Sequence, residues 1–333
     1  MSQRLPPRAD TLTRVKVLVT GGAGYIGSVV THDLADAGHE VVVLDDLSAG
    51  FAFTIPAGVE FHQLPVHEIG RVLTPSAGFD AVLHFAGRIE VAESVARPDL
   101  YWNINVAGSM AVLDAIRAAG TPRMIFSSTG SMYDAADTGK LTEDAPVRPR
   151  NPYAATKLAV DLMLAGESGA FGLGAASLRY FNAAGAVGPL GERHNPESHL
   201  IPIVLQVAGG QREELMLYGD DYPTPDGTCV RDYIHVADLS AAHLLALDAI
   251  QPGRYELYNL GNGDGYSNRQ VVEAVREVTG RPVPVKVAPR RPGDAAVTVA
   301  SSEKARRELG WRPARPDLRE IIADAWAFHQ ASW

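Results

Sequence analysis

The sequence predicts an α/β protein with a doubly wound parallel sheet and a second, smaller α/β lobe. Short, nearly continuous apolar runs alternate with helical patterns, and a glycine-rich turn directly follows the first run. These runs are VKVLVT (15–20), EVVVLD (40–45), AVLHFA (81–86), RMIFSS (123–128) and AASLRYF (175–181). Apolar strands separated by helices are typical of a parallel sheet that helices cover on both faces.

The helical patterns complete this order of elements. IGSVVTHDLADAG (26–38) has helical period and ends at Gly38, a residue suited to the turn that terminates a helix. Further helices are expected at 100–120, 153–168, 200–209 and 233–250 and near 302–309 and 317–330, with a strand at 255–261. Loops rich in Gly and Pro appear after about residue 185. We expect a flexible tail (1–14), a sheet domain (15–185 plus about 232–261) and a smaller lobe (186–231 and 262–333).

Composition excludes several classes of protein. The 333 residues carry a formal net charge of −9, which argues against binding to nucleic acid or to an anionic membrane surface. No stretch approaches the roughly 20 apolar residues of a membrane span, and MSQRLPPRADTLTR (1–14) does not resemble a secretory signal. Cys229 is the sole cysteine, so we expect a packed thiol, no internal disulfide and a cytoplasmic protein. The histidines look scattered, without partners at ligand spacing, and no metal site is expected.

The glycine-rich turn, TGGAGYIG (20–27), predicts a dinucleotide site of the Rossmann type. Gly21, Gly24 and Gly27 allow a tight turn and a close approach of the backbone to a pyrophosphate at the N-terminus of the next helix. Asp45 ends the second strand, where a carboxylate binds the adenosine ribose hydroxyls. Asp46 follows in place of an arginine, and a second carboxylate would repel a 2′-phosphate. The sequence therefore favours NAD over NADP.

NPYAATK (151–157) places Tyr153 and Lys157 on the same face of a helix. An isolated pair with this spacing would be an ordinary surface feature. Here Thr129 ends a preceding strand, at the sheet edge where the glycine turn also lies. A dinucleotide fold with threonine, tyrosine and lysine in this order resembles the extended short-chain dehydrogenases/reductases. The resemblance implies that Tyr153 is the base, its pKa lowered from about 10 by Lys157 and by a nicotinium cation. Lys157 would also bind the nicotinamide ribose, and Thr129 the reacting oxygen of the substrate.

Longer segments resemble the UDP-glucose 4-epimerase family over about residues 15 to 330. They are HFAGRIEVAESV (84–95), YFNAAGA (180–186), ESHLIPIVLQVA (197–208), YGDDYPTPDGTCVRDYIHV (218–236) and RRPGD (290–294). The resemblance implies inversion at C4 of a UDP-hexose, UDP-glucose or UDP-galactose, through a transient 4-keto sugar. Tyr153 would take the O4 proton while NAD accepts and then returns the C4 hydride. The sheet domain would bind NAD, and the smaller lobe the UDP-sugar.

The resemblance also implies individual contacts. Those with the cofactor fall on Gly21, Gly24, Tyr25, Ile26, Gly27, Asp45, Phe85, Ala86, Gly87, Asn105, Ser127, Tyr153, Lys157 and Tyr180. Those with the substrate fall on Thr129, Asn182, His199, Leu200, Arg231, Arg291, Asp294 and Thr298. The arginines would pair with the diphosphate, and Asp294 would accept from the uridine ribose. Thr298 stands where the family can carry a bulky tyrosine, so an N-acetyl group at C2 is expected to fit.

Three positions depart from the family pattern. Pro65 stands where an acid near adenine is usual, and Arg88 stands near the place of a common lysine. Asp134 stands where glycine is usual, and the sequence gives no reason for it. The expected side-chain contact with adenine is therefore in doubt.

Other functions remain open at this stage. A sugar-nucleotide 4,6-dehydratase would need an Asp-Glu pair where this chain has Gly130 and Ser131. An epimerase for UDP-glucuronate stays open because Arg193 could face a C6 carboxylate, and an epimerase for UDP-GlcNAc/GalNAc stays open too. A non-catalytic dinucleotide-binding protein is less favoured, because Tyr153 and Lys157 are both present.

The resemblance also implies a homodimer. In the family, the helices near 100–119 and 153–168 commonly pack as a four-helix bundle. Leu158, Leu162 and Leu164 permit such packing but could also lie inside the protein.

Overall fold

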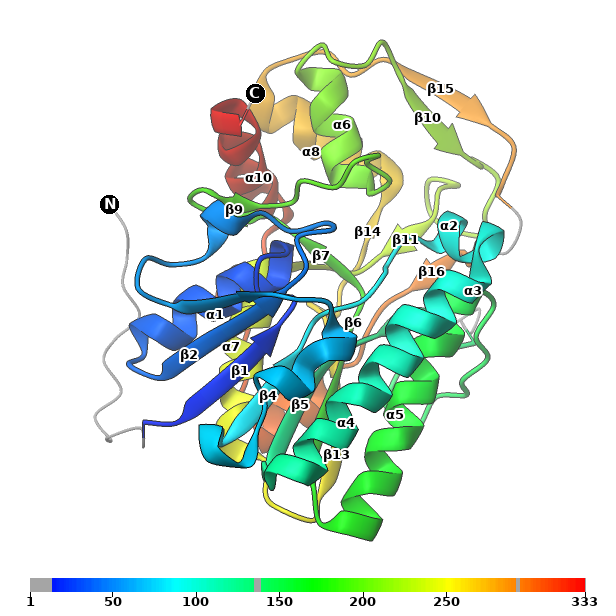
Figure 1. The fold of residues 1–333 in the computed structure, drawn as a ribbon. Coiled ribbons are helices and arrows are strands. Elements are labelled where there is room, and N and C mark those ends of the chain that lie inside the picture. The colour runs from blue at the N-terminus through cyan, green and yellow to red at the C-terminus, as the bar shows by residue number, and fades with distance from the viewer. Residues whose placement is uncertain (1–13, 135–138, 292–293, 333) are drawn as a thin grey trace.

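A seven-stranded parallel sheet forms the centre of the protein. The computed structural model describes residues 14–134, 139–291 and 294–332 (Figure 1). The strand order is β13-β6-β5-β4-β1-β2-β3, and all neighbours are parallel. These strands are β1 (Lys16–Thr20), β2 (Glu40–Asp45), β3 (Glu60–Gln63), β4 (Ala81–His84), β5 (Arg123–Thr129), β6 (Gly174–Tyr180) and β13 (Tyr255–Leu260). The predicted doubly wound sheet is confirmed.

Helices cover both faces of this sheet, and successive strand residues pack on opposite sides. Val17 and Val19 belong to a hydrophobic cluster with α1 (Tyr25–Asp36) and α7 (Val236–Ala249). Leu18, between them, packs in a second cluster with α4 (Gly108–Ala119) and α5 (Pro152–Phe171). The near-continuous apolar character of β1 follows from this two-sided burial.

A smaller lobe lies beyond the carboxyl ends of the strands, at the top of Figure 1. Its core packs α6 (Leu200–Ala208), α8 (Asn268–Thr279) and α10 (Leu318–Ser332) together. Short strands complete it in the pairs β10-β15, β12-β7 and β8-β9 and the triple β14-β11-β16. They are β7 (Asn182–Ala184), β8 (Ala186–Val187), β9 (Leu190–Gly191), β10 (Leu215–Tyr218), β11 (Val230–Arg231), β12 (Tyr233–His235), β14 (Tyr266–Ser267), β15 (Val285–Ala288) and β16 (Val297–Thr298).

The remaining helical segments are short. They are α2 (Val91–Ala96), α3 (Pro98–Tyr101), α9 (Glu303–Glu308), a π-helical stretch (Trp102–Ala107) and 3₁₀ turns at Ala52–Thr54, Val66–Arg71, Pro75–Ala77 and Gly130–Met132. None of the helices among the described residues combines the length and apolar character that crossing a membrane requires.

Two expected helices differ from the prediction. Residues 233–235 form strand β12, which pairs with β7, and the helix begins only at Val236. His235 explains this boundary, because its Nδ1 accepts a hydrogen bond from the backbone N–H of Ala237 at 3.0 Å and caps α7. The segment 100–120 is divided into α3, the π-helical stretch and α4. Of the expected tail, residues 1–13 lie outside the described part of the chain.

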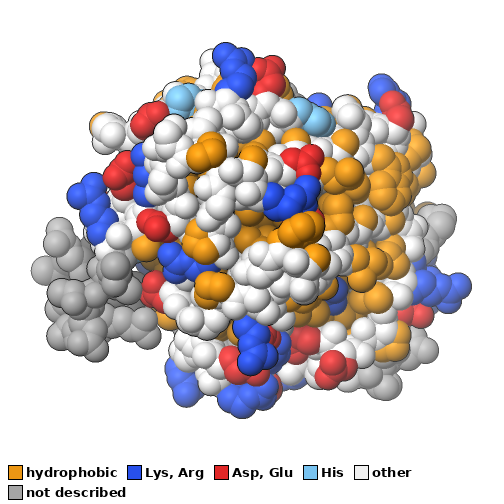
Figure 2. All heavy atoms as spheres, turned by 60° about the horizontal axis from the view of Figure 1, so that its bottom comes forward, with side chains coloured by type: hydrophobic (Ala, Val, Ile, Leu, Met, Phe, Trp, Pro, Cys, Tyr) orange, Lys and Arg blue, Asp and Glu red, His pale blue; other side chains and the backbone are white. Residues whose placement is uncertain are grey.

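Hydrophobic side chains gather on the surface of one side of the sheet domain. They appear on the right of Figure 2, the side on which α4 and α5 lie in Figure 1. Trp102 and Met110 are 45% and 51% exposed there, and Leu162 is 67% exposed. Leu164, by contrast, is fully buried in the core. Of the leucines considered for an interface, Leu162 therefore faces outward and Leu164 packs internally.

Candidate active site

The glycine turn after β1 forms a cradle that side chains cannot enter. A Cβ on Gly27 would lie 2.2 Å from the carbonyl oxygen of Gly21, and a Cβ on Gly21 would lie 2.6 Å from the backbone N of Ala86. Gly24 precedes α1 without a side-chain cap, and the first turn of α1 carries no acidic residue. The free N–H groups and the positive end of the helix dipole are therefore available to a diphosphate. These features fit a bound dinucleotide.

Asp45 lies at the carboxyl end of β2, next to this cradle. Its carboxylate is 7% exposed and accepts hydrogen bonds from the backbone N–H groups of Ala23 (3.0 Å) and Leu47 (2.8 Å). These bonds hold the carboxylate against the glycine turn, where an adenosine ribose would lie. Tyr25, at the start of α1, donates its hydroxyl to the carbonyl oxygen of Gly185 at 2.7 Å, which ties the turn to the other half of the chain.

Thr129, Tyr153 and Lys157 come together where β5 ends and α5 begins. Asn151 caps α5 by accepting from the N–H of Ala154 at 2.8 Å, which sets the first turn that carries Tyr153. The Tyr153 hydroxyl is hydrogen-bonded to Thr129. The ammonium of Lys157 donates to the carbonyl oxygen of Ser127 at 2.9 Å. The structure therefore brings the predicted proton-transfer group together at one sheet edge.

The electrostatics of this group differ from the sequence-based expectation. Burial raises the pKa of Tyr153 to about 12; the hydrogen bond with Thr129 lowers it, and the charge of Glu90 raises it. Burial also lowers the pKa of Lys157 to about 8. For the chain's own residues burial dominates, and the net effect is a raised pKa. The lowering expected from Lys157 and a nicotinium cation together stays a prediction for the protein with NAD bound. A cation beside the phenol must supply the lowering.

A buried ion pair, which the sequence analysis missed, supports the lysine. Arg179 on β6 and Asp161 on α5 lie 2.9 Å apart, with side chains 6% and 3% exposed. Ser128 donates to the same carboxylate at 3.1 Å. Asp161 lies four residues after Lys157, one helical turn away, so this pair anchors the face of α5 that carries the lysine. The sequence signal for this ion pair was that Asp161 and Arg179, 18 positions apart, are each a single charge within an apolar segment.

Asn105 and the segment after β4 line the other side of Lys157. Asn105 lies in the π-helical stretch, a distortion that often occurs at functional sites. Its Oδ1 accepts from the N–H of Arg88 (2.7 Å), and its Nδ2 donates to Thr156 (3.0 Å). A Cβ on Gly87 would lie 3.7 Å from the Lys157 ammonium. Asn105 therefore fixes the loop of Phe85, Ala86 and Gly87 against α5. Tyr180 contacts Ser127 through its hydroxyl.

The residues predicted to bind substrate lie in two places. One group lies around strands β11 and β16, and the other lies at β7 and at the start of α6. Arg231 on β11 pairs with Thr298 on β16, and its guanidinium lies 3.9 Å from Asp294. Arg291 lies with its guanidinium 3.9 Å from the ring centroid of Tyr218. Of RRPGD, Pro292 and Gly293 lie outside the described residues. Asn182 begins β7, and His199 and Leu200 lie where the loop enters α6. Their contacts with substrate stay predictions.

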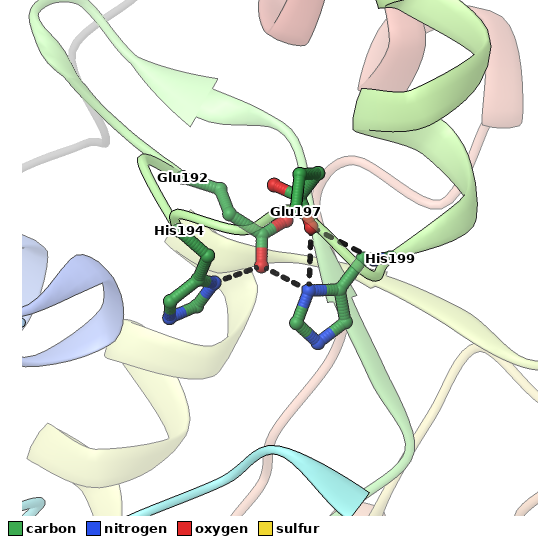
Figure 3. Close-up of side chains that lie close together, drawn as sticks. All are labelled: Glu192, His194, Glu197 and His199. Atoms are coloured by element: carbon green, nitrogen blue, oxygen red, sulfur yellow. Dashed lines mark hydrogen bonds and ion pairs between the residues drawn. The ribbon is translucent and has the colours of Figure 1, made fainter. Parts of the chain in front are cut away.

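Four acidic and histidine side chains meet in the loop before α6 (Figure 3). They are Glu192, His194, Glu197 and His199, and one potential ligand atom from each lies within 4.8 Å of all the others. The statement that the histidines lack carboxylate partners at ligand spacing is therefore wrong for this loop. The sequence signal for this cluster was a pair of Glu-x-His motifs, of which the first ends at His194 and the second begins three positions later at Glu197. Cys229 is buried and its thiol is free, as expected.

Comparisons with known proteins agree with this geometry. The family model for the NAD dependent epimerase/dehydratase family matches residues 17–261. The chain is 51% identical over 317 residues to a UDP-glucose 4-epimerase of Corynebacterium glutamicum, covering 95% of this chain and 96% of the relative. It is 54% identical over 319 residues to one of Streptomyces lividans, with the same coverage of both chains. The chain belongs to the UDP-glucose 4-epimerases of this NAD-dependent family.

A solved structure extends this similarity to three dimensions. The UDP-glucose 4-epimerase of Stenotrophomonas maltophila, crystallised with bound NAD and formylated UDP-arabinopyranose, superposes with a TM-score of 0.92 at 39% identity. The match covers 96% of this epimerase and 99% of that chain. The Rossmann-type fold and the NAD dependence predicted from the sequence are confirmed.

The structure also accounts for residues on which the rival functions depended. A Cβ on Gly130 would lie 2.6 Å from the ring of Phe181, so the acid of a 4,6-dehydratase does not fit this epimerase without moving that ring. The Arg193 guanidinium packs over the rings of Phe328 (4.5 Å) and Phe53 (5.3 Å), which removes the sequence argument for a uronate. Asp134, which departs from the family pattern, pairs with Arg150 at 2.7 Å.

Proposed function

We propose that this epimerase inverts C4 of a UDP-hexose, interconverting UDP-glucose and UDP-galactose, with a tightly held NAD. The observation that carries the proposal is the hydrogen-bonded Thr129–Tyr153 pair on the same sheet edge as the glycine cradle and Asp45. Asp45 and the neighbouring Asp46 favour NAD over a 2′-phosphorylated dinucleotide. The glycine cradle and Asp45 would hold NAD, which would supply a reversible hydride acceptor for C4.

Tyr153 takes and returns the O4 proton in this proposal. Its buried phenol has a pKa near 12, too high for a base at neutral pH, and a positive charge next to the ring is required to lower it. Thr129 holds the sugar oxygen within reach of the phenol. Lys157, held by the carbonyl oxygen of Ser127, binds the nicotinamide ribose and adds positive charge at this point.

The substrate is held mainly through its nucleotide half. Arg231 and Arg291 pair with the diphosphate, Asp294 accepts from the uridine ribose, and Asn182, His199 and Leu200 contact the nucleotide. Affinity concentrated there leaves the keto sugar free to turn between the two hydride transfers.

The test replaces Tyr153 by phenylalanine and follows conversion of UDP-galactose to UDP-glucose by NMR. Loss of a general base lowers the rate by about 10²–10⁴-fold, while NAD remains bound. Tyr258→Phe is the matched control, because it removes a hydroxyl that contacts Glu308 on α9, away from the site. Undiminished epimerisation by Tyr153→Phe would refute the assignment. Bound NAD without turnover in the wild type would favour the non-catalytic alternative.

We propose further that UDP-GlcNAc and UDP-GalNAc are accepted, because Thr298 is small and sits beside Arg231 in the sheet. A tyrosine at this position would fill the space next to C2. Thr298→Tyr should reduce turnover of the N-acetyl pair more than that of UDP-glucose, and Thr298→Ser should change neither. Absence of any N-acetyl turnover in the wild type would contradict this proposal.

We propose a homodimer through the exposed apolar side chains of α4 and α5 (Figure 2). Met110 on α4 and Leu162 on α5, with Trp102 in the π-helical stretch just before α4, are 45–67% exposed. Light scattering should give twice the chain mass for the wild type and the single mass for Leu162→Asp. Val287→Asp is the control, since Val287 is 46% exposed but lies on β15 in the other lobe. A monomeric wild type would contradict the proposal.

We also propose a cytoplasmic location, which the lone buried cysteine supports. Activity recovered outside the cytoplasmic fraction of the source cells would contradict it.

A further inference from the structure

The loop between β9 and α6 holds two Glu-x-His pairs that converge on one point (Figure 3). Glu192 Oε1 lies 2.8 Å from Nδ1 of His194 and 2.8 Å from Nδ1 of His199. Glu197 Oε1 lies 3.0 Å from the same His199 Nδ1. Four side chains from eight consecutive residues thus direct their donor atoms toward a common centre.

Hydrogen bonds satisfy part of this arrangement, because Glu197 Oε1 also accepts from the backbone N–H groups of Ser198 (2.8 Å) and His199 (2.7 Å). Nδ1 of His199 carries at most one proton, yet two carboxylate oxygens face it at 2.8 and 3.0 Å. The two carboxylates are 8% and 4% exposed, and buried carboxylates require a compensating charge. The neighbouring guanidinium, that of Arg193, is packed between Phe53 and Phe328. A cation between the four donors would satisfy both oxygens and both rings.

The donor set and its spacing match a particular cation. Bonds of about 2.0–2.1 Å in a tetrahedron separate the donor atoms by about 3.3–3.4 Å. The three separations of 2.8–3.0 Å would widen by about 0.3–0.6 Å, and the other three, all within 4.8 Å, would settle near the same spacing. Two imidazole nitrogens with two carboxylate oxygens suit zinc, whereas calcium and magnesium prefer oxygen ligands throughout. Four protein ligands fill a tetrahedral shell and leave no open position, which is the arrangement of a structural site. His199, with its side chain 41% exposed, leaves a path of entry.

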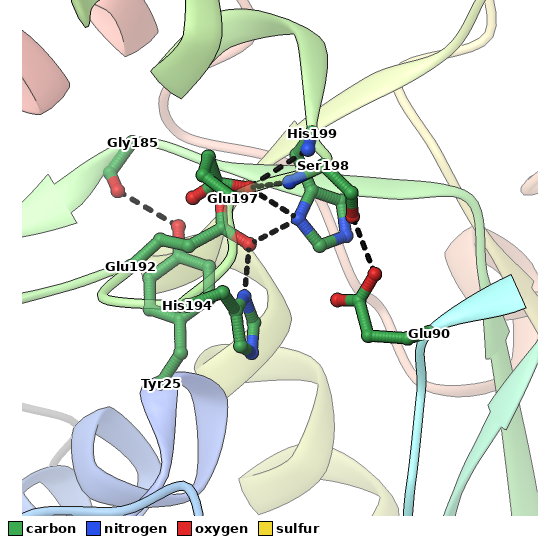
Figure 4. A network of polar contacts seen from close by, with 8 residues as sticks. All are labelled: Tyr25, Glu90, Gly185, Glu192, His194, Glu197, Ser198 and His199. Carbon is green, nitrogen blue, oxygen red and sulfur yellow. Dashed lines mark hydrogen bonds and ion pairs between the residues drawn. The ribbon is translucent and has the colours of Figure 1, made fainter. Parts of the chain in front are cut away.

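The loop connects both halves of the active site (Figure 4). Ser198 donates its hydroxyl to Glu90 at 2.6 Å, and the charge of Glu90 acts on Tyr153. His199 occupies the N-cap position of α6, whose first residue is Leu200, without a side-chain hydrogen bond to the helix. Tyr25, from the glycine turn, donates to Gly185 beside Glu192. We propose that Glu192, His194, Glu197 and His199 bind one structural zinc ion, which holds the loop that meets the nucleotide.

The test measures zinc directly, on protein purified without an oligohistidine tag. Elemental analysis should find one zinc per chain, and isothermal titration of the chelator-treated protein with zinc chloride should regain one site. Loss of an outer-shell partner typically weakens the affinity of a metal site by about 10–100-fold. The double variant His194→Gln with His199→Gln removes two direct ligands, so we expect its zinc affinity to fall by more than this range. Cobalt in place of zinc should give the intense visible band of a tetrahedral ion in the wild type alone.

The sequence provides a matched control. Glu60 and His62 form the same Glu-x-His pair, 2.7 Å apart, but on exposed strand β3 and without a second pair beside it. His62→Gln should keep the full zinc content. Retained NAD and an unchanged circular dichroism spectrum verify that the variants fold. Equal zinc content in the wild type and in the folded double variant, or none in either, would overturn the proposal. Zinc content is measured without turnover, so this result does not depend on the proposed epimerisation.

Discussion

Gly27→Ala tests whether the glycine cradle is shaped by its backbone. The added Cβ would lie 2.2 Å from the carbonyl oxygen of Gly21 and 3.0 Å from its carbonyl carbon. Both atoms belong to the backbone, so no side-chain rotation relieves the overlap and the turn itself must move. Overpacking of this kind costs about 1–3 kcal/mol. We therefore expect both a less stable fold and a turn that no longer admits a diphosphate.

The control is Gly166→Ala, in the middle of α5. A Cβ there would meet no atom within 4 Å outside its own helix backbone, and the residue is exposed. Alanine is favoured over glycine in a helix by about 1 kcal/mol, so this variant should gain stability. The two variants should differ by about 2–4 kcal/mol in the free energy of unfolding.

Two measurements decide the outcome. Urea denaturation gives the free energies of unfolding, and NAD released from the denatured protein gives the bound fraction after purification. Gly27→Ala should have lost most of its NAD, and Gly166→Ala should retain it. A Gly27→Ala protein with wild-type stability and a full complement of NAD would refute the reasoning, because the cradle would then tolerate a side chain.

Two further predictions concern buried charges. Asp161→Asn leaves Arg179 buried without its carboxylate and should cost about 3–5 kcal/mol in urea denaturation; Asp99→Asn, which removes an exposed partner of Arg97, should cost less than about 1 kcal/mol. Burial lowers the pKa of Lys157 to about 8 from 10.5, so the unfolded chain binds the extra proton between these values. Wild-type stability should therefore rise relative to Lys157→Met as the pH increases through this window. Equal losses for the two asparagine variants, or a pH-independent difference for the lysine variant, would contradict these assignments.

Local patterns were sufficient to predict the sheet and the position of its ligand site. Residues 16–20 are apolar almost throughout because Val17 and Val19 pack on one face of the sheet and Leu18 on the other. The glycine turn, Asp45 and Thr129 follow strands whose carboxyl ends meet at one edge. The family resemblance added the roles of these residues. Their positions at the ends of successive strands were enough to predict that they lie close together.

Properties that arise only in the folded chain were not predictable in the same way. The strand at residues 233–235 is only three residues long, so its apolar residues could not be separated from the helix that follows, and its conformation depends on pairing with β7. The pKa of Tyr153 is expected to fall when Lys157 and a nicotinium cation lie beside it, whereas burial among the chain's own residues raises it. Spacing reveals neighbours along a helix, whereas desolvation depends on the elements that pack around it.

The Glu-x-His pairs show that the sequence alone cannot distinguish an exposed ion pair from a buried cluster. The pairs at 60–62, 192–194 and 197–199 have identical spacing, and each taken alone is an ordinary ion pair. On strand β3 the pair remains exposed and single. In the loop before α6 both ends are anchored, at Gly191 in β9 and at Leu200 in α6, so the chain must turn back and bring the second pair onto the first. Two carboxylates are then buried together, and the charge that neutralises them also sets the position of the loop. In the proposed site a zinc ion supplies that charge beside the segment that enters α6, and Ser198 and Glu90 link this segment to the surroundings of Tyr153.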